Sequence, residues 1–126
     1  MASRGATIKN GHVTTSEYKL VKEICGMKIL TGTTTAHGLP DFSHTPNRIY
    51  VKENKDGSLR EMRFFGNDCY PILEFGYHPE PGITGNRHDK VLHYHTFGKN
   101  LSRSKAAALT KELIKKYRKF LEVYGL

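Results

Sequence analysis

Cysteine, tryptophan and long apolar runs are scarce or missing in this chain of 126 residues. It has no tryptophan and two cysteines, Cys25 and Cys69, with no CxxC motif, so we expect neither a disulfide framework nor a cysteine-bound zinc ion. No apolar run approaches the ~20 residues of a membrane helix. The first residues, MASRGATIKNGHV, lack the apolar segment of a signal peptide. We therefore expect a reduced, cytoplasmic protein without a membrane partner.

Acidic residues are also few, because 12 Asp and Glu stand against 20 Lys and Arg, which gives a formal net charge of +8. A charge of this sign attracts polyanions, so RNA or another phosphate-bearing polymer is the expected partner. The alternative is a basic protein whose charge lies on a solvated face. The length favours one domain, and we place it at residues 15–126 behind a flexible N-terminal segment, 1–14.

Apolar spacing predicts a helix near each end of this domain. The first covers about residues 16–25, with Ser16 as its N-cap and Gly26 as its stop. The second is a long helix in LSRSKAAALTKELIKKYRKFLEVYGL, capped by Ser102 or Ser104. Its apolar stripe has helical period and would cover one face of a sheet.

Four β-rich runs lie between the two helices. Asp56-Gly57 separates the runs 48–53 and 59–65, and a DG pair between alternating runs is a strong hairpin signal. Further strands are expected at 70–77 and 91–97, with connections short enough for antiparallel neighbours. The predicted fold class is α+β: a four-stranded antiparallel meander with a short N-terminal helix and a long C-terminal helix packed on one face.

Polar residues interrupt these apolar strands, and alternation places them on the face away from the helices. They are Arg63, Glu74, His93 and His95. RNA cleavage through the 2′-hydroxyl needs a base, an acid and a cation over the phosphate, and these residue types supply all three without a cofactor or a metal. We therefore predict a metal-independent ribonuclease with these four residues as catalytic groups. The predicted substrate-binding residues nearby are Arg87, His88, His78 and Lys90.

Three other interpretations of the same residues remain open. The pair His93 and His95 could chelate a metal ion with His78, His88 or Glu74 as the third ligand, as in a metal-dependent hydrolase. The histidines could also be polar surface residues of a half-exposed strand. Finally, the chain could be a non-catalytic module that binds nucleic acid or a protein partner, such as a phage accessory protein or an inhibitor.

Residues 45–97 resemble the toxin-like C-terminal modules of bacterial polymorphic toxins and of phage head-associated proteins. The features that carry the resemblance are Pro46-Asn47, Asp56-Gly57, Arg63 before two aromatics, Glu74, His78-Pro79, and His93 with His95. Such modules are thought to belong with metal-independent ribonuclease folds of the barnase, colicin and RelE type. The resemblance implies RNA cleavage, with Arg63, His93 and His95 in the active site.

Overall fold

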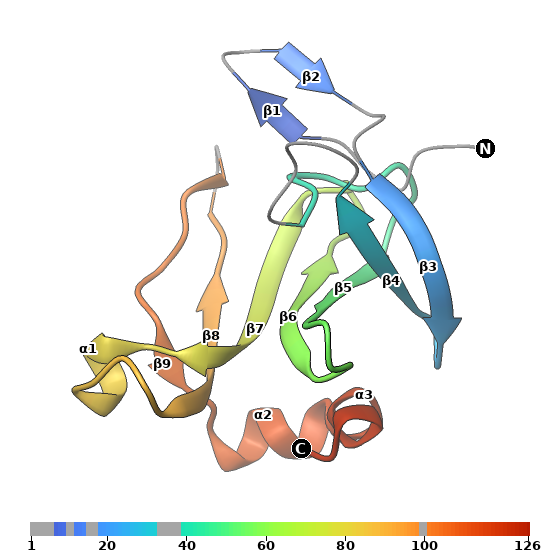
Figure 1. The fold of residues 1–126 in the computed structure, drawn as a ribbon. Helices are drawn as coiled ribbons and strands as arrows, with labels where there is room; N and C mark the ends of the chain where they lie inside the picture. Colours follow the sequence, from blue (N-terminus) through green and yellow to red (C-terminus); the bar gives the residue numbers. More distant parts are fainter. Residues whose placement is uncertain (1–6, 10–11, 15–17, 33–38, 99–100) are drawn as a thin grey trace.

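A computed structural model describes residues 7–9, 12–14, 18–32, 39–98 and 101–126. Its main feature is a seven-stranded mixed sheet in the order β3-β4-β5-β6-β7-β8-β9 (Figure 1). The strands are β3 (Tyr18–Ile24), β4 (Met27–Gly32), β5 (Ile49–Glu53), β6 (Leu59–Phe65), β7 (Pro71–Pro79), β8 (Lys90–Thr96) and β9 (Ala107–Ala108). Neighbours are antiparallel except β4 and β5, which are parallel.

The helices are all short. They are α1 (Pro81–Thr84), α2 (Lys111–Lys116), α3 (Arg118–Leu121) and the 3-10 helix η2 (Glu122–Tyr124). The predicted α+β fold, a four-stranded meander flanked by a short and a long helix, is therefore wrong. Within the predicted flexible segment 1–14, β1 (Thr7–Lys9) and β2 (His12–Thr14) pair antiparallel, and the rest of that segment lies outside the described residues.

The predicted N-terminal helix at 16–25 is instead strand β3 in its described part, 18–24. Cys25 and Gly26, at φ 51° and 79°, form a two-residue turn that returns the chain antiparallel into β4. Two successive positive φ values are typical of the hairpin turn whose twist matches the flanking strands. Gly26 thus turns a hairpin, where the sequence pattern suggested the end of a helix.

The predicted long C-terminal helix is also wrong, because tertiary contacts hold its first third in an extended form. Ala107 and Ala108 pair with β8, and the carbonyl of Ser104 faces the ring of His95. Helix α2 begins only after Thr110, whose hydroxyl accepts from the N–H of Leu113. The contacts of the extended segment with the sheet replace the hydrogen bonds that a helix would form there.

The four predicted strands of the central region do form, as β5 to β8, and each pairs antiparallel with the next. The predicted hairpin around Asp56-Gly57 is confirmed. Gly57 takes φ 86°, and the Asp56 side chain accepts from the N–H and hydroxyl of Ser58. These hydrogen bonds lower the pKa of Asp56.

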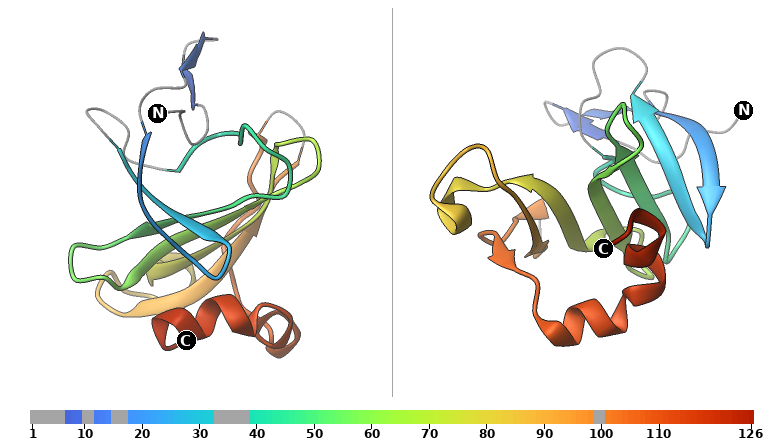
Figure 2. Two further views of the ribbon diagram at one scale, coloured as in Figure 1. Left: turned by 90° about the vertical axis from the view of Figure 1, so that its right-hand side faces the viewer. Right: turned by 60° about the horizontal axis from the view of Figure 1, so that its bottom comes forward.

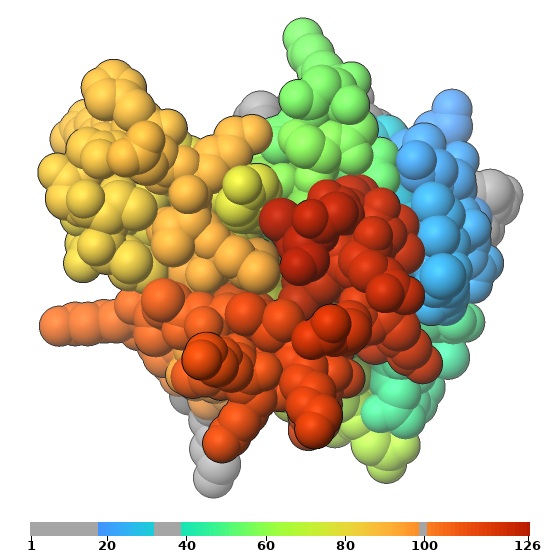
Figure 3. Space-filling view, turned by 90° about the horizontal axis from the view of Figure 1, so that it is seen from below, coloured from blue at the N-terminus to red at the C-terminus, as the bar shows by residue number. Residues whose placement is uncertain are grey.

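The two faces of the sheet carry different cores. One face packs against the C-terminal segment 109–124, whose Leu121 is fully buried with Phe75 and Met62. Figures 1 and 3 show this segment, in orange and red, lying across the underside of the sheet. The opposite face holds a smaller cluster of Tyr18, Leu30, Leu39, Tyr50 and Phe65. Figure 2 shows that the sheet is strongly curved.

No helix formed by the residues described here has both the length and the apolar character needed to span a membrane.

Candidate metal centre

The polar residues singled out in the sequence lie on one face of the sheet, the face away from α2 and α3. We call it the histidine face. The strand register pairs Arg63 with Glu74 and Glu74 with His95, so these three form one row across β6, β7 and β8. The neighbouring row consists of Glu61, Gly76 and His93. The expectation that Arg63, Glu74, His93 and His95 share a face is therefore confirmed.

Arg63 and Glu74 form a buried ion pair within the first row. The Arg63 Nε donates to Glu74 Oε2 at 2.6 Å, and Nη1 donates to the carbonyl oxygens of Leu39 and Pro40 at 3.2 and 2.8 Å. The other carboxylate oxygen accepts from Arg103 Nη1 at 3.2 Å. Protein groups thus occupy both the guanidinium fork and the carboxylate, which gives the pair a structural role.

His95 lies beside this ion pair with its ring fixed by the backbone. Its Nδ1 is 2.8 Å from the carbonyl oxygen of Ser104, and because a carbonyl only accepts, Nδ1 carries the proton. The ring is packed at a right angle to that of His93, with centroids 5.5 Å apart. His93 and His95 are therefore neighbours, but their rings do not form a chelating pair.

His93 is fully buried, and one of its ring nitrogens lacks a hydrogen bond to the described residues. Its Nδ1 donates to the carbonyl oxygen of Val91 at 2.9 Å. Its Nε2 is buried and makes no hydrogen bond to any of the described residues. Burial lowers the pKa of His93 below the ordinary value of 6.5, and the neighbouring His78 and His95 lower it further. The neutral imidazole therefore presents an unpaired lone pair at Nε2.

The side chains of His78 and Glu80 face this unpaired nitrogen. The His78 ring is T-shaped against that of His93, with centroids 4.5 Å apart, and its Nδ1 is 3.1 Å from the carbonyl oxygen of Pro79. Glu80 Oε2 is 3.9 Å from His93 Nε2. One ligand atom from each of the three residues lies within 4.8 Å of the others.

Gly76 makes this convergence possible. A Cβ atom built on Gly76 would stand 2.7 Å from His93 Nε2 and 2.9 Å from His78 Nε2. Both Nε2 atoms thus point at the same small space above the glycine. Any side chain at residue 76 would fill that space and displace both rings.

Two imidazoles and one carboxylate make up a donor set that suits zinc and the later first-row metals. At tetrahedral zinc, with bonds of about 2.1 Å, ligand atoms lie roughly 3.4 Å apart. The 3.9 Å between His93 Nε2 and Glu80 Oε2 is close to this value. Metal-bound histidines usually give their other N–H to a carbonyl, as His78 and His93 are placed to do.

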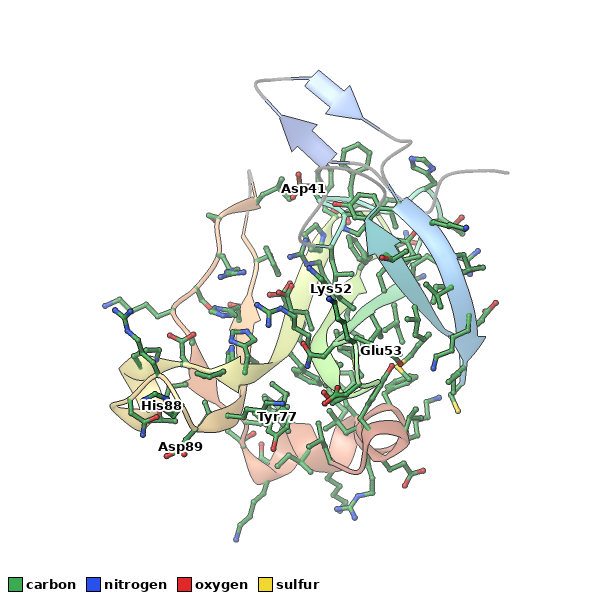
Figure 4. All side chains as sticks on the ribbon, viewed as in Figure 1. Asp41, Lys52, Glu53, Tyr77, His88 and Asp89 are labelled. Carbon is green, nitrogen blue, oxygen red and sulfur yellow. The ribbon has the colours of Figure 1, made fainter. Side chains whose placement is uncertain are left out.

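The remaining predicted substrate-binding residues lie apart from this trio. Arg87 and His88 are exposed in the loop between α1 and β8, where Asn86 accepts from the N–H of His88 (Figure 4). The Lys90 ammonium lies over the Tyr77 ring, 5.7 Å from its centroid. Of the four residues predicted to bind substrate, only His78 belongs to the cluster.

Sequence reasoning missed Glu80 as a possible ligand. It took His93 and His95 as the chelating pair and offered His78 only as one choice for the third ligand. The signal was available in the run GYHPE, because a glycine inside a strand often marks a close approach. His78 and Glu80 then follow two and four residues later. What the sequence alone does not give is the cross-strand pairing of Gly76 with His93.

Comparison with protein-family models, with curated proteins and with solved structures found no significant match to this chain. The resemblance to toxin-like modules therefore stays a prediction.

Proposed function

We propose that this protein is a metal-dependent hydrolase of phosphodiesters, with a divalent ion bound by His78, Glu80 and His93. The observation that carries the proposal is the buried Nε2 of His93, which makes no hydrogen bond to any described residue and lies near two further potential ligands, His78 and Glu80. An unsatisfied buried polar atom costs about 1–3 kcal/mol. A bond to a metal ion would remove this cost and use the lone pair that the neutral ring presents.

Three protein ligands support catalysis better than a purely structural role. Structural zinc sites have four protein ligands, whereas catalytic sites keep a position for water or substrate. An ion in such a site polarises a phosphoryl oxygen and lowers the pKa of a water molecule that it binds to about 7. Glu80 is on the open side of the trio, with 29% of its side chain exposed.

The charge of the protein favours nucleic acid as the source of the phosphodiester. The net charge is +8, and Arg103, which donates to Glu74 on the histidine face, is itself exposed. Lys and Arg near a polyanion release its counterions and so favour binding. We propose RNA as the substrate and the cytoplasm as the setting, where Cys25 and Cys69, both free thiols, stay reduced.

The metal-independent ribonuclease predicted from the sequence would use the same face without an ion. The contacts described above support the metal-centred version for two reasons. The fork of Arg63 is occupied by Glu74, and His93 has no exposed surface with which to reach a substrate. A metal ion bound to His93 Nε2 could contact a substrate that the buried ring itself cannot touch.

The test uses untagged protein stripped with EDTA. We expect calorimetric titration with zinc to show one ion per chain in the wild type and none in His78→Ala, with His88→Ala as an exposed control that binds normally. Labelled single-stranded RNA should be cleaved with the ion and stay intact in EDTA. Wild-type protein without a bound ion would overturn the proposal. Cleavage in EDTA would favour the metal-independent ribonuclease, and salt-sensitive RNA binding without cleavage would favour the binding module.

A further inference from the structure

Glu61 lies on the far side of Gly76 from His93. The register pairs Glu61 on β6 with Gly76 on β7, and Gly76 with His93 on β8. All three residues belong to the histidine face, so Glu61 and His93 flank the glycine from opposite sides. The space into which the two Nε2 atoms point therefore has Glu61 as its neighbour across the sheet.

The Glu61 carboxylate is unpaired within the part of the chain that the structure describes. Its side chain is half-buried, yet it makes no hydrogen bond or ion pair with any residue in the described ranges. The cation opposite it in the register, Lys52, forms no salt bridge with it there. The other carboxylates of the central sheet differ, because Glu74 is paired with Arg63 and Glu53 with Lys22 and Tyr124.

The strand register puts Glu61 within one side-chain length of the space above Gly76. Side chains directly opposite in an antiparallel pair have Cβ atoms about 5 Å apart. His93 Nε2 and His78 Nε2 lie 2.7 and 2.9 Å from the Cβ position of Gly76. A glutamate side chain is long enough to bridge the remaining gap to a water molecule on the ion.

We propose that Glu61 is the general base of the hydrolase, an inference that rests on the proposed metal-dependent function. As the water oxygen forms its bond to phosphorus, the Glu61 carboxylate takes the proton from that water. The bond between phosphorus and the leaving oxygen breaks, and the same proton passes to that oxygen. The products are one phosphate monoester and one alcohol, which together contain the atoms of the substrate and one water.

The test compares Glu61→Gln with the wild type in metal binding and in hydrolysis of both RNA and bis(4-nitrophenyl) phosphate. Because Gln keeps the shape but cannot take a proton, zinc affinity should stay within about twofold of wild type, while kcat falls about 10²–10⁴-fold. Glu61→Asp, which keeps a carboxylate, should recover part of the activity, and Glu122→Gln, far from the face, should behave as wild type.

The results distinguish a failure of the inference about Glu61 from a failure of the proposed function. If Glu61→Gln cleaves at the wild-type rate, Glu61 is not the base even though the metal site stands. If its zinc affinity falls tenfold or more, Glu61 is a fourth ligand and the inference is wrong. If wild-type protein binds no ion or cleaves no phosphodiester, both proposals fail together. Circular dichroism of each variant checks that the loss of activity is not a loss of fold.

Discussion

Gly76 is the residue on which the proposed metal site depends most directly, although it supplies no ligand. We predict that Gly76→Ala abolishes zinc binding, because its Cβ would lie within 3 Å of both ligand nitrogens. Gly82→Ala is the matched control, since its Cβ would meet only Glu80 Oε1 at 3.8 Å, an ordinary contact. Isothermal titration of both variants checks this. Normal zinc affinity in Gly76→Ala would contradict the geometry described here.

His93 should make the stability of the metal-free protein depend on pH. Burial lowers the pKa of His93 in the folded state below 6.5. As the pH falls, the unfolded chain therefore binds a proton at His93 at a higher pH than the folded chain does. The contribution of His93 to the stability of the folded protein is therefore complete above pH 6.5. It is lost as the pH falls from 6.5 towards the folded-state pKa.

Urea unfolding in EDTA at several pH values measures this effect. His93→Gln should show a flatter dependence on pH than wild type, because it has no group to titrate at this position. His88→Gln removes an exposed histidine and should retain the wild-type slope. An unchanged slope in His93→Gln would show that other groups set the acid sensitivity.

At the scale of elements, the Arg63–Glu74 pair ties four parts of the chain together. It joins β6 to β7, holds the carbonyls of residues 39 and 40, and anchors Arg103. We predict that Arg63→Met destabilises the fold by about 3–5 kcal/mol, because it leaves the buried Glu74 carboxylate without its main partner. The double variant with Glu74→Met should recover part of the loss.

The control for this prediction is Arg103→Met, in which the lost side chain is 49% exposed. Its cost should be at most about 1 kcal/mol, since water screens the interaction. Urea denaturation gives all three free energies. An equal loss of unfolding free energy in Arg63→Met and Arg103→Met would mean that burial does not determine how strongly each arginine stabilises Glu74.

The C-terminal segment stabilises the fold through one fully buried leucine. Leu121 has 0% exposure and packs with Phe75 and Met62 on the face away from the histidines. We predict that Leu121→Ala costs about 2–5 kcal/mol by leaving a cavity. Leu126→Ala, at a leucine that is 36% exposed, should change stability by less than about 0.5 kcal/mol. Thermal and urea unfolding would show whether the two losses differ.

The sequence predicted elements correctly where local turn chemistry decides the structure. Asp56-Gly57 fixes a hairpin, and the strands on either side follow from it. At Cys25-Gly26 a tight hairpin turn was hidden, because Leu20, Val21 and Ile24 happen to match a helical period. At Ala107 and Ala108, residues with high helix propensity pair with β8 because contacts far away in the sequence outweigh that propensity.

At the scale of the whole molecule, the net charge of +8 should govern binding to nucleic acid. We predict that affinity for single-stranded RNA falls at least about tenfold between 50 and 200 mM salt, through counterion release. Affinity for zinc should change far less, because zinc binding releases no counterions from a polyanion. Fluorescence anisotropy of labelled RNA measures the first quantity. An RNA affinity that does not change with salt concentration would exclude binding through contacts to the phosphates.

The proposed site itself was only partly predictable from sequence. Alternation placed His93, Glu74 and Arg63 on one face, and the structure agrees. Which of them pair with each other depends on side-chain packing across strands, and that is set by the register and by the missing side chain of Gly76. The sequence therefore predicts which residue types lie on the face. It does not predict that Glu74 pairs with Arg63 while His93 lies beside His78 and Glu80.

The one parallel contact in the sheet, between β4 and β5, has a consequence for how the chain folds. Strands β5 to β8 pair with sequence neighbours through short connections, whereas Gly32, the end of β4, and Ile49, the start of β5, lie farther apart in the sequence. Loop closure of this kind carries an entropy cost before it gains any contact. The β3–β4 hairpin should therefore dock late, onto a sheet in which the rows of the histidine face are already aligned.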